Sequence, residues 1–396
     1  MNHLELFPEL QKYTREFRTG ILPSQEIRKL TVENHITADI PISEEQIQPA
    51  SLDLRLGPVA YRVRASFLPS AKRPVSKHIA DLTMHTIDLS SPAVLETNCV
   101  YIIPVLEELH LSSRYSGRAN PKSSTGRLDV FTRIITEYGT EFDNIPAAYH
   151  GKLYLEVAPR TFSIVVRSGS RLNQLRFIRG KPLPSDAQMQ ELHQSETLAY
   201  AENDLPANPI FDDGLWISVS LRGQPSDIVG YRARPHAPVV DIEKVAYYEP
   251  AEFWEPILAS ARNDVILNPG DFYILGSKEK VSVPPLFAAE MVGYDPAVGE
   301  FRVHYAGFFD PGFGYTARHA RGTRAVLEVR SHEVPFVLEH GQRVGRLIFE
   351  RLLSQPDKVY GRGIGSSYQR QDLALSKHFT ATHFASALGD SLRRDC

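Results

Sequence analysis

The chain contains two tandem copies of one sequence unit, and this repeat limits the folds that the chain can adopt. Residues 151–177 align without a gap on residues 323–349, a shift of 172 positions. The identities at this shift are Leu95/Leu267, Tyr101/Tyr273, Ile102/Ile274, Leu155/Leu327, Glu156/Glu328, Val157/Val329, Val165/Val337, Gly169/Gly341, Arg171/Arg343, Leu175/Leu347 and Phe177/Phe349. A constant register over so long a span indicates a duplicated structural unit.

Within each copy, the apolar residues come in short runs typical of β-strands. Runs such as 100–103 and 336–338 are separated by Gly, Pro, Asn or Asp, and several alternate with period two. The 25 glycines and 28 prolines make turns frequent. This pattern predicts a mainly β fold, a barrel or jelly roll in each copy. Short helices are predicted at 4–18, 24–31, 185–196 and 251–260.

The length of the chain supports the same division. With 396 residues, of which 42% are hydrophobic and 23% charged, two globular domains are expected. The predicted parts are a first domain at 1–180, a linker or insertion at 181–235 with a strand at 215–221, and a second domain at 236–396.

Composition also bounds the location and the partners. A net charge of −3 gives no general attraction to polyanions, so no nucleic-acid partner is expected. The first residues lack the apolar stretch of a signal peptide, so we expect a cytoplasmic protein without a membrane partner. Cys99 and Cys396 lie too far apart in sequence for a Cys-x-x-Cys site, and structural thiols are expected.

Copy one contains a short run suited to binding an anion. Residues 121–127, Pro-Lys-Ser-Ser-Thr-Gly-Arg, combine small hydroxyls with two cations, and phosphate oxygens need such converging donors. The candidate phosphate ligands are Lys122, Ser123, Ser124 and Arg127. A polar turn with two surface cations is the alternative. The equivalent residues 293–300 of copy two are acidic and lack the serine pair, so only copy one offers such a site.

Copy two contains a hairpin signature that copy one lacks. An apolar segment from Tyr305 enters Asp310-Pro311-Gly312, a turn sequence that by itself is structural. The equivalent residues 136–143 have no such turn. Each copy has therefore lost what the other retains.

Two further features of copy two are open to a functional interpretation. Glu328 lies in the apolar run 325–329, where a carboxyl is costly to bury and suited to proton transfer. A solvent-facing position on a half-exposed strand is the alternative, and Glu156 has the same setting. Residues 360–371 are rich in Gly, aromatic and cationic side chains, as in a flap that orders over a ligand, or in a frayed tail.

Together these segments resemble the dCTP deaminase and dUTPase superfamily over most of both copies. In copy one, 49–57 resembles the opening strand motif, 122–127 the phosphate motif and 169–175 the later Gly-x-Arg-x-x-Gln-Leu strand. In copy two, 306–328 is similar to the hairpin that receives the pyrimidine and sugar, and 360–379 to the closing tail. The resemblance implies two tandem dUTPase-like distorted jelly-roll domains of the β-clip type.

In trimeric members of this superfamily, one subunit supplies the phosphate motif and a neighbour supplies the hairpin. The division between the copies therefore implies one composite site, and it favours Glu328 over Glu156. Single-chain viral dUTPases are similar in splitting their motifs between copies. A monomer with a pseudo-oligomeric site and a homo-oligomer both agree with this arrangement.

The resemblance implies zinc-independent hydrolysis of dCTP to dUTP and ammonia. Glu328 would move protons during attack of water on C4, Ser123 and the Ala306 carbonyl would hold the water, and Arg127 would contact the phosphates. dUTPases usually lack this glutamate and rely on the hairpin aspartate, here Asp310. The substrate-binding residues implied are Lys122, Ser124, Gln174, Asp310, Phe313, Tyr360, Tyr368 and Gln371.

Cofactors and rival activities follow from the same comparison. The resemblance implies Mg²⁺ on the triphosphate and dTTP as a regulator, whereas the zinc deaminases need a His-x-Glu and Pro-Cys-x-x-Cys set that this sequence lacks. Two residues depart from the pattern: Lys122 replaces an arginine and Ser367 a tail lysine. The alternatives are a dUTP diphosphatase, a bifunctional deaminase that forms dUMP, and a non-catalytic nucleotide-binding protein.

Overall fold

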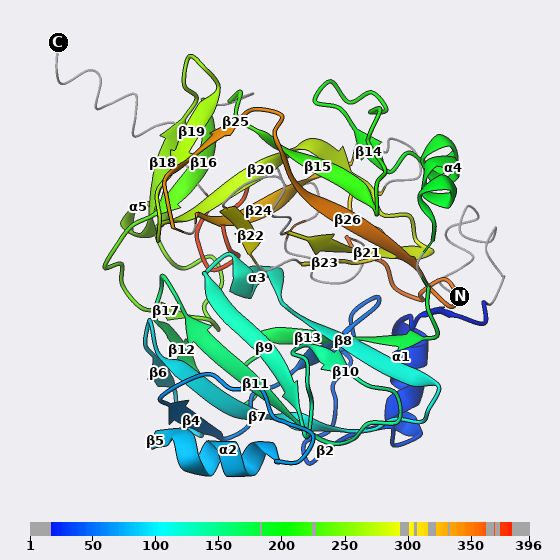
Figure 1. Ribbon diagram of the computed structural model, residues 1–396, viewed down its shortest axis with the longest axis vertical. Helices are drawn as coiled ribbons and strands as arrows, with labels where there is room; N and C mark the ends of the chain where they lie inside the picture. The colour runs from blue at the N-terminus through cyan, green and yellow to red at the C-terminus, as the bar shows by residue number, and fades with distance from the viewer. Residues whose placement is uncertain are drawn as a thin grey trace.

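The computed structural model describes residues 17–182, 184–223, 227–293, 301–304, 307–315, 322–331, 333–361, 368 and 373–381. The two copies form two β-rich lobes, with copy one below and copy two above in Figure 1. The predicted mainly β class is confirmed.

Copy one consists mainly of two sheets that enclose an apolar core. The first sheet contains β1 (Gly20–Ile21), β13 (Asn173–Arg179), β8 (Tyr115–Pro121), β10 (Asn144–Ile145) and β3 (Leu52–Leu54). The second contains β5 (Thr83–Asp88), β4 (Val59–Val63), β7 (Val100–His110), β11 (His150–Pro159), β9 (Val130–Thr136) and β2 (Ile36–Ala38).

Copy two is built around one strongly branched sheet. Its strands are β18 (Trp254–Leu258), β16 (Ile228–Ala233), β20 (Phe272–Val281), β15 (Leu215–Ser220), β26 (Arg343–Arg351), β21 (Phe287–Val292), β23 (Phe308–Phe309), β14 (Ala199–Tyr200), β22 (Phe301–His304) and β24 (Thr323–Ser331). Two small sheets remain. One joins β6 (Ala93–Leu95) and β12 (Ile164–Val166) of copy one to β17 (Val240–Asp241) of copy two. The other pairs β19 (Asp264–Leu267) with β25 (Phe336–Glu339), both in copy two.

Strand pairing shows which strand of copy two corresponds to β3, the opening strand motif of copy one. Leu52 of β3 pairs with Leu175, and Leu215 of β15 pairs with Leu347, so β15 is the counterpart of β3. The strand predicted at 215–221 is thus present. It lies in the segment 181–235, which we expected to be a linker or insertion, and β16 of the same segment also joins the sheet of copy two.

The helices agree only partly with the prediction. Helix α1 (Ser24–Val32) and helix α4 (Asp186–Glu196) lie where helices were expected, and α4 begins with a capping box. The helix predicted at 251–260 is wrong: one turn, α5 (Pro250–Phe253), leads directly into β18. Pro256 has no N–H for a helix interior, and β18 instead pairs with β16. Most of the predicted helix 4–18 lies outside the described residues.

Two helices of copy one were not predicted. Helix α2 (Val75–Leu82) covers the outer face of the second sheet, and α3 (Ser123–Gly126) is a single turn inside the predicted phosphate motif. Figure 1 shows α3 at the boundary between the lobes.

One apolar core crosses that boundary. Phe162 of copy one packs edge-on against Phe253 and Trp254 of copy two, with ring centroids 5.6 and 5.3 Å apart. Phe272 and Ile274 of β20 belong to the same cluster. Each fully buried ring of this kind contributes about 2 kcal/mol of hydrophobic stabilisation. The boundary is therefore a packed interface on which a site can have fixed geometry.

Candidate active site

Strand β24 aims Glu328 at copy one. Successive side chains of a strand point to opposite faces, and Leu327 and Val329 belong to the core of copy two. Val326 lies on the other face and packs against the core that crosses the boundary. Glu328 shares the face of Val326, which faces copy one.

Burial controls the chemistry of the Glu328 carboxyl. Its residue is only 5% exposed, and burial raises the pKa of Glu328 well above its ordinary value. The guanidinium of Arg127 opposes this rise, and the carboxylate of Asp129 adds to it. Both neighbours come from copy one. In the part of the chain that the structure describes, the Glu328 carboxyl has no hydrogen bond or ion pair, which leaves it available to a ligand.

Arg127 connects the phosphate motif to the C-terminal tail. Its Nη1 donates to the carbonyl oxygens of Ala374 at 3.0 Å and Leu375 at 3.4 Å. Its guanidinium also stacks on the ring of Tyr368, with the carbon 3.7 Å from the ring centroid. Because Arg127 also acts on Glu328, it joins the phosphate motif of one copy to the carboxyl and the tail of the other.

The phosphate motif is held in place by the backbone and by the tail. The Lys122 N–H donates to the carbonyl of Leu172, and one helical turn follows at α3. The tail residue Ser376 donates its hydroxyl to the Ser124 carbonyl at 2.8 Å. Ser124 is buried, whereas Ser123 beside it is only partly buried and can reach a ligand.

Three cations gather around the buried Asp53. The Lys122 ammonium forms an ion pair with the Asp53 carboxylate, and an Arg171 nitrogen lies 3.9 Å from the same oxygen. Burial lowers the pKa of Lys377 in the tail, and the charge of Lys122 lowers it further. So much positive charge around one carboxylate suits a polyanionic ligand.

Gln174 supports this cradle from β13. Its amide donates to the Pro121 carbonyl at 3.3 Å, and its carbonyl accepts from the Ser51 hydroxyl at 3.1 Å. Gln174 thereby ties the opening strand motif to the strand that leads into α3.

The hairpin of copy two reaches the same place. Asp310 is partly buried, and desolvation of its carboxyl raises its pKa to about 6. Arg176, 3.9 Å away, and Lys122 oppose this rise, while Asp53 adds to it. Because Asp53 and Lys122 belong to the cradle of copy one, the hairpin aspartate and the phosphate motif form one electrostatic unit.

Aromatic side chains connect the hairpin to the tail. Phe313 lies 5.7 Å from the ring of Tyr360, whose N–H donates to the Pro311 carbonyl. The Tyr360 hydroxyl accepts from the N–H of Tyr368 at 3.1 Å. Gly312 has φ +94°, and a Cβ there would come within 3.1 Å of the Tyr360 backbone. The turn therefore needs its glycine both for the dihedral and for this approach.

The raised pKa of Asp310 predicts a measurable dependence of stability on pH. Because the folded pKa of about 6 exceeds the ordinary value of 3.8, wild type loses stability as pH rises between these values. Asp310→Asn lacks this loss, so its unfolding free energy relative to wild type should improve by about 2 kcal/mol from pH 4 to pH 7. Denaturant titrations measure it, with the exposed Glu339→Gln as control. A constant difference would contradict burial of this carboxyl.

Comparison with known proteins identifies the family. Residues 18–181 match the model of the 2'-deoxycytidine 5'-triphosphate deaminase N-terminal domain, and residues 185–379 match that of the C-terminal domain. The chain belongs to the dCTP deaminase family. A crystal structure of 2'-deoxycytidine 5'-triphosphate deaminase from Agrobacterium tumefaciens is 52% identical, with a TM-score of 0.81 over 85% of this chain and 100% of that chain.

Shorter members of the family align with only one part of this chain, which agrees with a duplication. A "dCTP deaminase, dUMP-forming" of Halobacterium salinarum is 31% identical over 43% of this chain but 85% of its own length. A "dCTP deaminase" of Natronomonas pharaonis is 29% identical over 43% of this chain and 84% of its own. Each aligns with less than half of this chain, as a single copy would. The resemblance and the predicted fold are confirmed.

The equivalent carboxyl of copy one is closed off. Glu156 is 1% exposed and accepts two hydrogen bonds from Arg133, the shorter at 2.6 Å, and one from Ser66 at 2.5 Å. Helix α2 and Phe67 pack over this face of the sheet. In copy two, the equivalent sheet face packs against copy one. In copy one, this face is covered by α2 and Phe67 of the same copy, and Glu156 on it is already paired.

The structure brings most of the predicted site residues together. Contacts and charge interactions link those named in the preceding paragraphs: Lys122, Ser124, Arg127, Gln174, Asp310, Phe313, Glu328, Tyr360 and Tyr368. Ser123 lies beside them at the start of α3. Ala306 and Gln371 lie outside the described residues.

Several neighbours of the site were not predicted as site residues. Arg171 and Lys377 stand inside motifs that carried the resemblance, so their charge was a usable signal. Arg176 was hidden in an apolar strand. Asp129 and Arg330 are 201 positions apart, and nothing in the sequence indicates that they meet.

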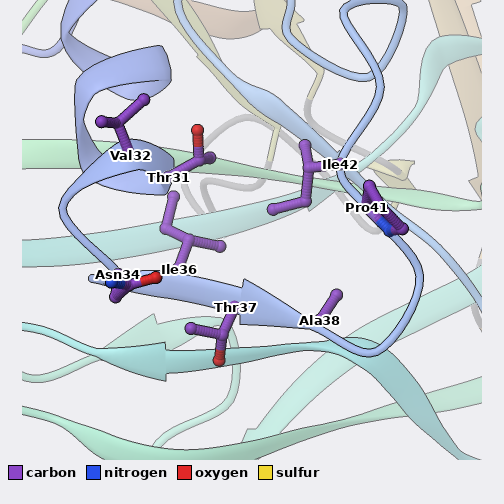
Figure 2. A pocket seen from close by; sticks show the side chains of 8 residues that line it. All are labelled: Thr31, Val32, Asn34, Ile36, Thr37, Ala38, Pro41 and Ile42. Atoms are coloured by element: carbon purple, nitrogen blue, oxygen red, sulfur yellow. The ribbon is translucent and has the colours of Figure 1, made fainter.

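A surface groove away from this site is lined by uncharged residues. It lies between α1 and β2, has a volume of about 330 Å³, and is shown in Figure 2. The lining residues are Thr31, Val32, Asn34, Ile36, Thr37, Ala38, Pro41 and Ile42. None of these eight carries a formal charge or is a predicted site residue. Among the described residues, no cluster of three potential metal ligands occurs, and no helix could cross a membrane.

Proposed function

We propose that the chain hydrolyses dCTP to dUTP and ammonia at one composite site between its two copies. The observation that carries this proposal is the buried Glu328 of copy two, which has no hydrogen bond or ion pair with the described residues, beside Arg127 of copy one. Membership of the dCTP deaminase family supports the reaction, and the charges around the site support a triphosphate substrate.

Glu328 carries the protons in this mechanism. Its carboxylate takes a proton from water as the oxygen attacks C4, and the same proton passes to N3 of the cytosine ring. The carboxylate then takes the second proton of the attacking oxygen and gives it to the amino group, which leaves as ammonia. The raised pKa of Glu328 makes its carboxylate a stronger base, which favours removal of each proton from the attacking oxygen.

Ser123 and Arg127 act on the same atoms from copy one. The partly buried Ser123 hydroxyl would hold the attacking water together with the Ala306 carbonyl. Arg127 would bind the phosphates and steady the negative charge that develops at the site. Asp310 would receive the sugar, and the wall of Phe313 and Tyr360 would exclude water from it.

Lys122, Ser124, Arg171 and Lys377 would bind the triphosphate. The buried Oδ1 of Asp53 has no hydrogen-bond partner among the described residues. Mg²⁺ prefers such an oxygen together with phosphates, so Asp53 fits a magnesium ion carried by the nucleotide. When bound, the ion would neutralise part of the triphosphate charge.

Regulation, location and assembly extend the proposal. dTTP has the same triphosphate and deoxyribose, and we propose that it binds the same cradle as a regulator. We expect the protein to act in the cytoplasm. Both halves of the proposed site come from one chain, which is compatible both with a monomer and with a homo-oligomer.

The product of the reaction decides between the related activities. Incubation with dCTP and Mg²⁺ should release ammonia without pyrophosphate. Release of both would indicate a bifunctional enzyme forming dUMP, as the name of the Halobacterium salinarum relative suggests. Pyrophosphate from dUTP alone would indicate a diphosphatase. No product from either nucleotide would contradict the proposal and leave a nucleotide-binding protein.

A further inference from the structure

A second pair of charges crosses the boundary beside Glu328. Arg330 lies two residues beyond Glu328 on β24 and therefore on the same face. Its Nη2 forms an ion pair with Asp129 of copy one and donates to the Thr161 hydroxyl at 2.9 Å. Thr161 in turn donates to Asp129 at 2.5 Å. Arg127 and Asp129 of copy one thus meet Glu328 and Arg330 of copy two with opposite charges facing each other.

The backbone of Asp129 is held in an uncommon conformation. Its φ is +55°, in the left-handed region that Asp and Asn tolerate better than most residues. Its N–H donates to the Gly126 carbonyl at 2.8 Å, and its carbonyl accepts from the Arg160 N–H at 2.9 Å. The residue is fully buried. Copy one therefore fixes the place from which the carboxylate reaches across the boundary.

This pair belongs to the Glu328 site alone. At the shift of the repeat, Arg330 corresponds to Ala158, so the Glu156 face has no cation at this position. A buried carboxylate such as Asp129 is costly unless it is paired. The Arg330 guanidinium neutralises the Asp129 charge only when β24 and the phosphate motif are correctly aligned across the boundary. The pair therefore links the alignment of the two copies to the place where Glu328 meets Arg127.

We propose that Asp129 and Arg330 are positioning residues for Glu328: their ion pair sets the loop that bears Arg127 against the strand that bears Glu328. This inference rests on the proposed function. The same placement has an electrostatic consequence, since the Asp129 carboxylate adds to the rise in the pKa of Glu328 that burial causes.

The other groups around Glu328 define the controls. Ile274, its partner on β20, is uncharged, and His304 occupies the opposite position on β22. Tyr360 and Tyr368 lie around Arg127 on the tail side. Because histidine is a titratable residue type and His304 holds the β22 position opposite Glu328, each variant is also made in a His304→Gln background.

Asp129→Asn tests the charge with little change of shape. Asn accepts the left-handed conformation and keeps a side-chain oxygen for Arg330 and Thr161. Because a negative neighbour is lost, the rise of kcat/KM with pH should move about one pH unit lower. KM for dCTP should stay within about two-fold, since Asp129 is fully buried and is not among the residues proposed to bind the nucleotide. Glu255→Gln, which removes a paired carboxylate on β18, should leave the profile in place.

Arg330→Gln tests the pairing itself. It removes the Arg330 cation from the buried Asp129, so kcat should fall about ten-fold with KM nearly constant, and Arg330→Lys should recover part of the loss. An unmoved pH profile in Asp129→Asn, or a rise in KM with constant kcat in either variant, would overturn the proposal.

A thermodynamic cycle separates this inference from the proposed function. The unfolding free energy of wild type, Glu328→Gln, Asp129→Asn and the double variant is measured from pH 5 to pH 8. Glu328 costs wild type stability as pH rises because its folded pKa is raised. This cost should be smaller in the Asp129→Asn background, whether or not the protein deaminates dCTP. Equal costs in both backgrounds would overturn the inference, and an inactive wild type would overturn only the function.

Discussion

Glu328→Gln is expected to abolish the release of ammonia from dCTP, with a fall in kcat of about 10³-fold or more. The amide keeps the shape of the side chain but cannot accept the proton of water. Binding of dCTP, measured by calorimetry, should change little because the residues proposed to bind the phosphates are unchanged in this variant. The variant should also be more stable than wild type at alkaline pH, since no buried carboxyl has to ionise.

Glu156→Gln is the matched control for this result. Glu156 occupies the equivalent strand position, but it is already paired with Arg133 and Ser66 under the cover of α2. Turnover should stay within a few-fold of wild type, whereas stability should fall because Arg133 loses its anion. Loss of turnover in Glu156→Gln with activity retained in Glu328→Gln would refute the assignment of the site to copy two.

Arg127→Met should produce the second largest loss, about 10²–10³-fold in kcat/KM. Methionine keeps much of the apolar volume, but it removes the bonds to Ala374 and Leu375 and the charge that faces Glu328. Any remaining activity should need a higher pH, because Arg127 normally lowers the pKa of Glu328. This shift is opposite in direction to that of Asp129→Asn.

Two further variants make the Arg127 experiment specific. Arg127→Lys should keep part of the activity, since it retains the charge but loses the planar stack on Tyr368. Arg133→Met removes another arginine that stacks on a ring and faces a glutamate, but in the closed face of copy one. It should reduce the melting temperature and spare turnover. Equal losses of activity in Arg127→Met and Arg133→Met would indicate general destabilisation.

The contrast between Glu156 and Glu328 depends on what covers two equivalent faces. In copy one, α2 and Phe67 pack against Ile102 and Tyr154. In copy two, the corresponding Ile274 and Val326 pack against the core that crosses the boundary. The first face is sealed by its own chain, and the second receives the phosphate motif. Duplication thus yielded two different environments for one sequence pattern.

Much of this protein could be predicted from its sequence. The duplication, the mainly β fold and the family followed from the repeat and from motifs such as Lys122–Arg127, because strand periodicity and local turn chemistry are written in neighbouring residues. The differences between the copies also indicated a composite site with Glu328. Strand β15 was predicted, but its membership of copy two was not, since the unequal connections to the following strands break the constant shift.

Other features were decided only by the tertiary structure. Helix 251–260 was wrong because pairing of β18 with β16 outweighed local helical preference. The same sequence context surrounds Glu156 and Glu328, and only packing closes one and opens the other. The Asp129–Arg330 pair joins residues 201 positions apart, and no local pattern records such a contact. Sequence by itself determined which chemistry the chain carries, and the meeting of the two copies decided where the charges that tune it lie, because electrostatic effects depend on distance and burial.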